Sequence, residues 1–432
     1  MRRWWWLLAL APTAVATRAL QAEGALLYPD GYQYLLMAKG IAAHGRPIVT
    51  LGAGGDTWLP NAEASLKPLF PTLVAALHVL GLSLRAAAEV VTAAASAAVC
   101  VLVGGVVSRL TGSGRAALAA GLLCVASPAL GHWATFSGPD PLAEALALGA
   151  ALALLHRRPG LAGALGGLCV AARPEYALLV LPLSLLSLRF AVAACAGVAA
   201  ILLAVRPPLA LNTAATTIAA APPDGLATLL RSDWPLLAVA AVGLVLAPRR
   251  HAVALAAAAS ALALVYTVKD PGSARYFAAL APWACVAAGY AIARRPGVIV
   301  ATAAAGLALF LPRAAEPPAE PFDAVAARLP GTAPLYTAAP DAYGLMLRRP
   351  IRFLRPGARG LILVDAAQRT YEPELVVHGR LVRTIAPRFG FVRPDGSVDA
   401  APARLVRGTA RYASSRYAAG RVIGGTSASR GR

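Results

Sequence analysis

The sequence has little charge and very little negative charge. Only 14% of its 432 residues are charged, and 40 basic residues outnumber 20 acidic ones, while 58% of the chain is hydrophobic. A soluble protein of this length could not bury so much apolar surface, whereas a lipid bilayer solvates it directly. The composition therefore excludes an ordinary soluble protein and predicts a protein of the membrane.

Residues that bind metals or form disulfides are also scarce. The five cysteines lie inside apolar runs, and none has CxxC spacing, which argues against both a disulfide framework and a zinc site. His44, His78 and His132 are isolated from one another. The stretch LGAGGD at 51–56 lacks a strand-helix context, so we do not interpret it as a nucleotide site.

The net charge of +20 does not indicate nucleic-acid binding. The sequence contains no recognised nucleic-acid-binding module and no platform of aromatic and basic residues. Arginine-rich loops between membrane spans give the same total charge, because such loops stay on the cytoplasmic side. We therefore expect a lipid bilayer, and no nucleic acid, as a partner.

Apolar segments recur along the chain as far as residue 312. Several are shorter than the roughly 20 residues that a straight membrane span needs, so their boundaries are soft. They lie at about 4–20, 68–84, 87–108, 116–131, 141–155, 160–172, 174–188, 190–205, 234–248, 251–268, 276–293 and 297–312.

The basic loops give an independent prediction of topology. Loops on the same side of a membrane are separated by an even number of spans, and basic loops are cytoplasmic. This parity holds from Arg115 onward and fails before it, unless the segment 68–84 lies in the interface or re-enters. The basic positions are Arg2–Arg3, Arg109 with Arg115, Arg157–Arg158, Arg189, Arg249–Arg250 and Arg294–Arg295.

We therefore predict a polytopic α-helical membrane protein of the cytoplasmic (inner) membrane. It has about eleven transmembrane helices within residues 1–313, and its N-terminus lies inside. Residues 21–86 form one long outer loop with interfacial helices. The C-terminus lies on the outer, extracytoplasmic side of the membrane.

The composition changes after the proline-rich junction LPRAAEPPAEP. The stretches APLYTAA, GLILVDA and ELVVHGRLVRTI are typical of short strands, and FDAVAARL is typical of a short helix. We predict a small extracytoplasmic α/β domain over 314–400. The tail 401–432 has seven arginines and no acid, which predicts a disordered basic segment.

Several ionisable residues fall in the predicted outer loops, where their cost at a membrane face favours a functional role. Each also has a simpler interpretation. Asp30 and Asp140 could cap helices, since Asp30 opens an amphipathic helix and Asp140 precedes Pro141. Lys67 and Arg275 could extend to lipid head groups. Their combination suits a reaction in which cations stabilise a leaving phosphate and a carboxylate takes a proton from a hydroxyl.

Two further patterns have structural interpretations. Tyr276, next to Arg275, is typical of an aromatic belt at the membrane surface. Gly163 and Gly167 have the spacing of close helix packing.

Five stretches, in this order, resemble the GT-C fold glycosyltransferases, and most nearly the bacterial branch with protein O-mannosyltransferases and the lipid A aminoarabinose transferase. The resemblance covers about residues 5–312. The stretches are YPDGYQYLLMAKGIAAHG, KPLFPTLVAALHVLG, SPALGHWATFSGPDPLAEAL, GGLCVAARPEYALLVLP and DPGSARYFAALAPW.

The resemblance implies transfer of a sugar from a polyprenyl-phosphate donor to a glycan, lipid or protein acceptor outside the membrane, usually with inversion. Asp30 matches the essential acid of the first outer loop, a base or metal-coordinating residue, and Asp140 matches the acid of the second. Lys67 and Arg275 would hold the donor phosphate. Arg173 and Glu175 look like an Arg-Pro-Glu turn with a structural role.

Two details depart from the family pattern: Gly31 follows Asp30 where a glutamate is common, and Lys67-Pro68 is followed by Leu69 where a second proline is common. Metal dependence differs within the superfamily, so a divalent ion held by Asp30 and Asp140 stays open as a cofactor.

Tyr28, Tyr32 and Tyr34 could line the sugar site or anchor the chain at the interface. Two other classes of function remain: a transporter or flippase of a lipid-linked substrate, and a non-catalytic membrane scaffold. A transporter would tend to carry charges in the middle of its spans and on both sides of the membrane, whereas the acids near the membrane here lie nearly all in predicted outer loops.

Overall fold

The structure is a computed structural model. It describes residues 5–21, 29–52, 55, 57–58, 67–134, 138–205, 224–269, 274–295, 322–329, 331–371, 374–392 and 398–413. The chain forms two compact units. The first consists of residues 1–48, 59–315 and 394–396, and the second of residues 49–58, 316–393 and 397–432.

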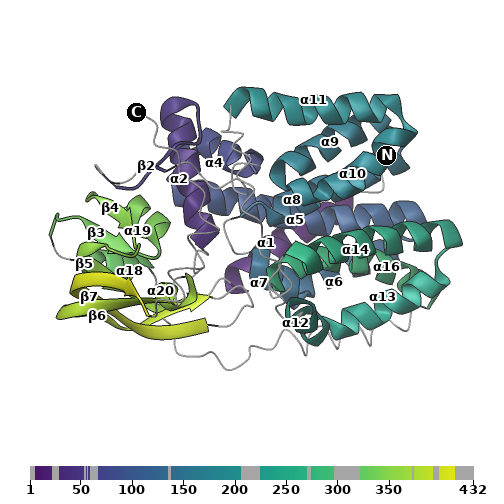
Figure 1. The fold of residues 1–432 in the computed structure, drawn as a ribbon. Coiled ribbons are helices and arrows are strands. Elements are labelled where there is room, and N and C mark those ends of the chain that lie inside the picture. Colours follow the sequence, from purple (N-terminus) through teal and green to yellow (C-terminus); the bar gives the residue numbers. More distant parts are fainter. Residues whose placement is uncertain are drawn as a thin grey trace. The chain divides into compact units, whose positions relative to one another are not determined.

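The first unit is helical (Figure 1). Up to residue 172 its elements are η1 (Trp5–Ala9), α1 (Leu10–Gln21), α2 (Pro29–His44), α4 (Leu69–Val79), α5 (Leu84–Thr111), α6 (Gly114–Ala126), α7 (Pro128–Ala134), α8 (Asp140–Leu155) and α9 (Pro159–Ala172). They are followed by η2 (Pro174–Tyr176), α10 (Ala177–Leu186), α11 (Leu188–Val205), α12 (Asp224–Ser232), α13 (Trp234–Leu246), α14 (Arg249–Lys269), α15 (Ala274–Phe277), η3 (Ala278–Leu280) and α16 (Ala281–Arg294).

Each predicted apolar segment corresponds to one or more of these helices, except 297–312, which lies outside the described residues. Among the described helices, α5, α11 and residues Arg249–Thr267 of α14 are long and apolar enough to cross a membrane. Shorter apolar helices include α9 and α13. The number of eleven spans therefore stays a prediction.

Local sequence explains where the longest helix begins and ends. The Ser83 side chain accepts a hydrogen bond from the backbone N–H of Ala86, at 3.1 Å, and so caps α5. Gly112 ends the helix with φ of 69°, a left-handed conformation that glycine adopts at little cost. Ser113 then caps α6 by accepting from the backbone N–H of Ala116. The adjacent Gly112 and Ser113 thus fix the turn between the two helices of an α-hairpin.

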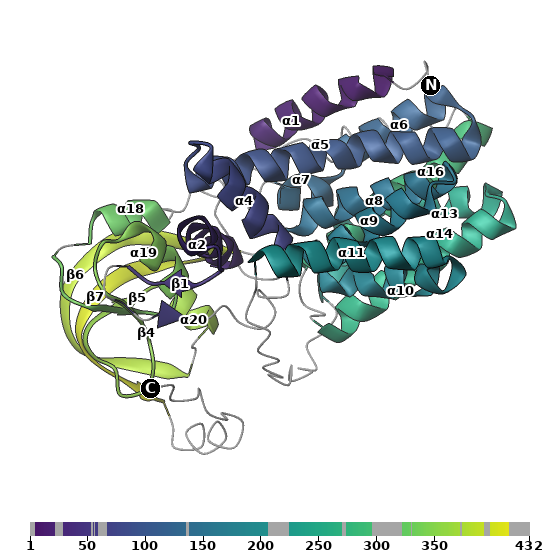
Figure 2. The same cartoon turned by 90° about the horizontal axis from the view of Figure 1, so that it is seen from above.

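Helix α5 lies in the core of the first unit, in contact with α1, α6, α8 and α16 (Figure 2). The buried side chains of this core are mostly Ala, Val, Leu and Cys. Small residues also allow close packing of α9 against α11. A Cβ at Gly163 would lie 2.2 Å from the Phe190 carbonyl oxygen, and one at Gly167 would lie 2.1 Å from that of Ala194. The predicted packing role of this glycine pair is confirmed.

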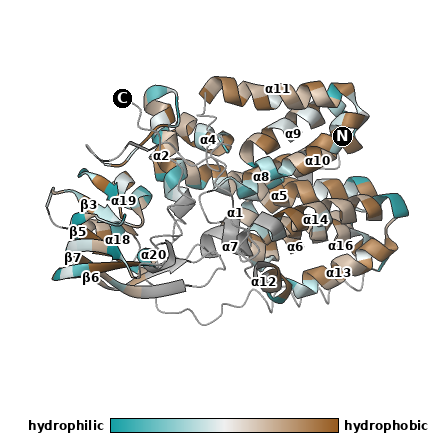
Figure 3. Cartoon of the chain, viewed as in Figure 1, coloured by the Kyte–Doolittle hydropathy of each residue, from teal (hydrophilic) through white to brown (hydrophobic). Residues whose placement is uncertain are grey.

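The faces of several helices expose large apolar side chains. Leu188 and Leu203 on α11 are 79% and 74% exposed, and Val245 on α13 is 84% exposed. Figure 3 shows α11, α13 and α14 as predominantly hydrophobic. Lipid solvates such side chains without penalty, whereas water does not. These faces are therefore those of a membrane-embedded helical unit.

Two pairs of predicted basic loops lie at helix ends that contact each other. At the end of α5, Arg109 Nε donates to the Leu155 carbonyl at the end of α8, at 3.3 Å. At another predicted cytoplasmic position, the start of α14, His251 is hydrogen-bonded to Tyr290 Oη of α16 at 2.6 Å. Basic loops that we assigned to one side therefore share an end of their helices.

The second unit is a five-stranded mixed sheet with short helices. Its strand order is β4-β3-β5-β7-β6, in which β3 is parallel to β4 and β5, and β7 is antiparallel to β5 and β6. Its elements are β1 (Val49–Thr50), β2 (Thr57–Trp58), α18 (Phe322–Ala327), β3 (Leu335–Thr337), α19 (Pro340–Met346), β4 (Ile351–Phe353), β5 (Arg359–Val364), α20 (Ala366–Tyr371), β6 (Leu375–Val392) and β7 (Val398–Tyr412). The predicted strands and the predicted helix are present as β3, β5, β6 and α18.

Residues 401–412 differ from the sequence prediction, which placed them in a disordered tail. They form most of strand β7, which lies between β5 and β6 (yellow in Figure 1). Ala403, Leu405 and Ala410 of this strand are buried, while Arg404 and Arg407 are exposed. The arginines are thus the solvent-facing residues of a strand whose apolar residues are small and easily overlooked.

Residues 49–58 also differ, because they fold with the second unit although they belong to the predicted first outer loop. The backbone N–H of Ile351 donates to the Leu51 carbonyl at 3.4 Å, and that of Gly52 donates to the Gly344 carbonyl at 3.1 Å. Gly52 has φ of 67°, and a Cβ there would lie 2.0 Å from the Arg349 carbonyl oxygen. The described part of LGAGGD is therefore structural packing beside β4.

Asp365 makes the stability of the second unit depend on pH. It is 2% exposed, accepts hydrogen bonds from Tyr343 Oη at 3.0 Å and from the Gln368 backbone N–H at 3.2 Å, and caps α20. Burial raises the pKa of this carboxyl from 3.8 to about 6. Folding thus favours the protonated form of Asp365. The resulting contribution to the free energy of unfolding is about 3 kcal/mol. This contribution is fully present below pH 3.8 and is lost as the pH rises through 6.

We expect the second unit to be more stable at pH 5 than at pH 8, by about 1 kcal/mol from this group. Hydrogen exchange of β5 and β7 peptides in the intact protein, corrected for the intrinsic effect of pH, measures this difference. Asp365→Asn should reduce it, because asparagine keeps the cap and does not titrate. An equal pH dependence in the variant would assign the effect to another group.

Candidate functional site

Asp140, Arg173 and Glu175 form a buried charged cluster, although they lie on separate elements. An Arg173 guanidinium nitrogen pairs with Asp140 Oδ1, and Arg173 Nη1 lies 3.6 Å from Glu175 Oε1. The side chains of Arg173, Asp140 and Glu175 are 2%, 13% and 6% exposed. One guanidinium thus faces two carboxylates, at the ends of helices that we predicted to face outside.

Two tyrosines cover the guanidinium. The Arg173 Cζ lies 4.8 Å from the Tyr276 ring centroid and 5.9 Å from that of Tyr266. The two rings stack with centroids 5.3 Å apart and planes at 11°. Such cation–π contacts are strongest where water is excluded. Tyr276 is only 8% exposed, so the prediction that it belongs to an aromatic belt is wrong.

The local sequence explains how this cluster forms. Helix α9 ends at Ala172, Arg173 is extended with φ of −148°, and Pro174 begins the short helix η2. The proline fixes the turn that returns Glu175 toward the guanidinium. Asp140 is the first residue of α8 and Pro139 holds the N-cap position, so Asp140 is not the N-cap residue of this helix. Its carboxylate is instead paired with Arg173.

The other predicted site residues lie on α2 and before α4, which are in contact. Asp30 is the second residue of α2, but its side chain lies outside the described residues. Lys67, two residues before α4, is 2% exposed. The Tyr34 and Phe70 rings pack edge to face with centroids 5.7 Å apart. The predicted first outer loop therefore contains a buried lysine close in sequence to α4, which contacts the helix of Asp30.

Tyr32 and Tyr34 are 5% and 1% exposed. They are therefore buried in protein, and interfacial anchoring does not describe them. Residues 31–38 of α2 are buried on every side, so the predicted amphipathic helix is wrong for this half of α2. Tyr28 and the Arg275 side chain lie outside the described residues.

The described residues do not fit a metal site. No group of three His, Cys, Asp or Glu side chains converges among them. The place beside the Asp140 carboxylate that a cation would take is occupied by the Arg173 guanidinium. We therefore derive no step through a metal ion.

Asp233 is a structural residue of this region that sequence reasoning did not find. Its carboxylate accepts from Ser127 Oγ at 2.5 Å, from the Ala129 backbone N–H at 3.1 Å and from Ser232 Oγ at 2.8 Å. It thus joins the start of α7 to the start of α13. An acid directly before the apolar run WPLLAVAAVG was the available signal, since a charge beside a span costs free energy unless it is paired.

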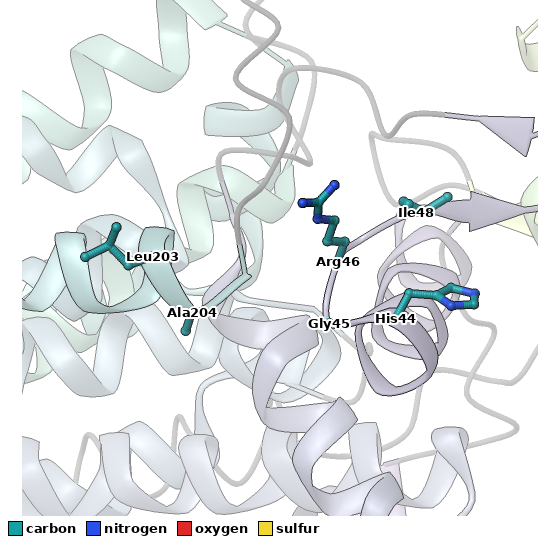
Figure 4. Close-up of a pocket in the computed structure, with 6 residues that line it drawn as sticks. All are labelled: His44, Gly45, Arg46, Ile48, Leu203 and Ala204. Atoms are coloured by element: carbon teal, nitrogen blue, oxygen red, sulfur yellow. The ribbon is translucent and has the colours of Figure 1, made fainter.

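A separate cavity of about 620 Å³ lies between the end of α11 and the turn that follows α2. Figure 4 shows Leu203 and Ala204 on one side of it and His44, Gly45, Arg46 and Ile48 on the other. None of the predicted site residues whose side chains the structure describes lines this cavity.

Comparison with known proteins gives a fold and no sequence family. No protein-family model matches the sequence, and no curated protein matches it either. Among solved structures, ArnT from Cupriavidus metallidurans in the apo state superposes with a TM-score of 0.57 at 12% identity, over 93% of this chain and 97% of ArnT.

Two further structures have the same fold. ArnT from the same organism bound to undecaprenyl phosphate gives a TM-score of 0.56 at 13% identity, over 95% of this chain and 98% of ArnT. The Archaeoglobus fulgidus oligosaccharyltransferase in complex with Zn and sulfate gives 0.53 at 14% identity, over 91% of this chain and 72% of that one. The resemblance read from the sequence is therefore confirmed as a shared fold: the chain has the GT-C fold of these glycosyltransferases.

Proposed function

We propose that the chain is a membrane glycosyltransferase. It moves a sugar from a polyprenyl-phosphate donor to an acceptor hydroxyl at the outer face of the cytoplasmic membrane, with inversion at the anomeric carbon. The acceptor is a glycan, a lipid or a protein.

One observation carries this proposal: nearly the whole chain shares its fold with ArnT, in a structure that holds undecaprenyl phosphate. The match extends over 95% of this chain and 98% of ArnT, so it includes both the helical unit and the C-terminal unit. A transporter or scaffold would not be expected to retain this arrangement together with a buried lysine and paired acids in its predicted outer loops.

The residues give each step of the reaction a candidate. The Asp30 carboxylate takes the proton of the acceptor hydroxyl as its oxygen attacks the anomeric carbon. The bond between that carbon and the donor phosphate oxygen breaks, and its electron pair leaves with the polyprenyl phosphate. Lys67 and Arg275 stabilise the negative charge that develops on this phosphate.

Asp140 supports the site without acting as the base. Its carboxylate is already paired with the Arg173 guanidinium, and such pairing favours the ionised form and weakens it as a proton acceptor. The same pair fixes the start of α8 relative to the end of α9. Arg173 and Glu175 are thus positioning residues in this account.

Lys67→Met should weaken binding of undecaprenyl phosphate about 10- to 100-fold, because a hydrogen bond to a charged group contributes about 1.5–3 kcal/mol. A binding titration of the lipid against the purified protein in nanodiscs gives the dissociation constant. Lys39→Met is the matched control, since Lys39 is an exposed lysine of the neighbouring helix α2, and it should bind the lipid as wild type does. Equal affinity of Lys67→Met and wild type would remove Lys67 from the phosphate site.

The function itself is tested with a panel of radiolabelled undecaprenyl-phosphate sugars. Purified protein in nanodiscs is incubated with each donor and an envelope extract as the acceptor source. Consumption of one donor supports the proposal and names the sugar.

A further inference from the structure

Gln33 is the one amide side chain in the fully buried part of α2. It is 5% exposed, and its Nε2 has no hydrogen-bond partner among the residues that the structure describes. Its neighbours in residues 31–38 are Gly, Tyr, Leu, Met and Ala. A polar group in such surroundings is conspicuous, because apolar residues would fill the same space at lower cost.

The cost is substantial. A buried donor without a partner destabilises a fold by about 1–3 kcal/mol, and most buried polar groups are therefore bonded. Gln368 of the second unit is the ordinary case: it is 7% exposed, and its Nε2 donates to the Leu375 carbonyl at 2.7 Å. A ligand that accepts a hydrogen bond from Gln33 Nε2 would offset the cost of burying this donor.

The position of Gln33 on α2 indicates which class of ligand accepts this hydrogen bond. Asp30, Gln33 and Tyr34 are three and four residues apart on α2 and so share one helix face. Tyr34 packs against Phe70, which lies three residues after the buried Lys67. Gln33 therefore lies on the helix that carries Asp30, and this helix contacts α4, which begins two residues after Lys67.

We propose that the Gln33 side chain donates a hydrogen bond to a hydroxyl of the sugar that is transferred; this rests on the proposed function. A neutral amide suits an uncharged sugar hydroxyl, whereas the phosphate is matched by the cation of Lys67. Gln33 is thus a specificity-determining residue. A site built to bond a hydroxyl discriminates against a sugar that lacks it, because the buried amide is then left unpaired.

The test compares binding with stability. Gln33→Met keeps the length of the side chain and removes the amide. We expect it to bind the tightest undecaprenyl-phosphate sugar of the panel about 3- to 10-fold more weakly than wild type, as loss of one neutral hydrogen bond predicts. Undecaprenyl phosphate itself should bind equally to both proteins. The thermal unfolding midpoint should stay the same or rise, because an unpaired buried donor has been removed.

The control is Gln368→Met, which breaks a formed hydrogen bond. It should lower the unfolding midpoint and leave both lipids bound as in wild type. Gln33→Leu repeats the test with a second apolar side chain in case Gln33→Met does not fold.

Three results would overturn the proposal: unchanged binding of the sugar donor, equal weakening of the sugar donor and of undecaprenyl phosphate, or a lower midpoint of the kind seen for Gln368→Met. The test measures binding and not turnover. Failure of the Gln33 proposal can therefore be distinguished from failure of the proposed function. A wild-type protein that binds the sugar donor but transfers nothing would contradict the catalysis alone.

Discussion

Asp30→Asn is expected to lower the rate of sugar transfer about 10²- to 10⁴-fold, the usual contribution of a general base. Asparagine has nearly the same size as aspartate but cannot take the proton of the acceptor hydroxyl. Donor binding should change much less than the rate, because Lys67 and Arg275 hold the phosphate in this account. Initial rates at saturating donor, with the dissociation constant of undecaprenyl phosphate measured in parallel, separate the two effects.

Asp323→Asn is the matched control for this prediction. Asp323 is an exposed aspartate in the first turn of α18, and its carboxylate accepts a hydrogen bond from the Ala324 backbone N–H at 3.0 Å. The same chemical change there should leave transfer unaltered. If Asp30→Asn transfers sugar at the rate of wild type while it elutes as a folded protein, Asp30 is not the base.

Arg173→Met is expected to have the largest effect on stability. The side chain of Arg173 is 2% exposed and its guanidinium faces Asp140 and Glu175, so the substitution removes a cation that is paired with two buried carboxylates. Loss of one partner of a buried ion pair typically lowers the free energy of unfolding by about 3–5 kcal/mol. Thermal and denaturant unfolding in detergent should both show this loss.

A pair on the protein surface provides the comparison. Arg85 Nε lies 3.0 Å from Glu89 Oε1, and the two side chains are 50% and 52% exposed. Arg85→Gln should cost no more than about 0.5 kcal/mol, because water and salt screen this pair. Adding Asp140→Asn to Arg173→Met should recover part of the lost stability. If Arg173→Met unfolds like Arg85→Gln, the buried cluster does not stabilise the helical unit.

The helical unit was largely predictable because its signal is local. Apolar runs, Ser83 as a cap and Gly112 as a stop determine helices over short stretches of chain. Strand β7 was missed because a strand is stabilised by residues far away in sequence, here β5 and β6. Its Ala and Arg residues carry little β-signal by themselves.

The candidate site was predictable only as a set of residues. The sequence placed Asp140, Arg173 and Glu175 in outer loops, but it did not show that Arg173 pairs with both acids. That pairing depends on how α8 and α9 meet, and Tyr266 and Tyr276 join it from helices about 100 residues away. The Gln33 amide, which has no hydrogen-bond partner among the described residues, could not be identified from the sequence, because this property depends on the residues around it.

The most direct test of the account is the fate of the donor lipid. Purified protein is incubated with doubly labelled undecaprenyl-phosphate sugars and acceptor extract, and free undecaprenyl phosphate and transferred sugar are counted together. We predict that wild type converts one donor into equal amounts of the two products and that Asp30→Asn does not. If no donor of the panel is converted while the lipids bind equally to both proteins, the chain is not the transferase proposed here, and a transport or scaffold function would take its place.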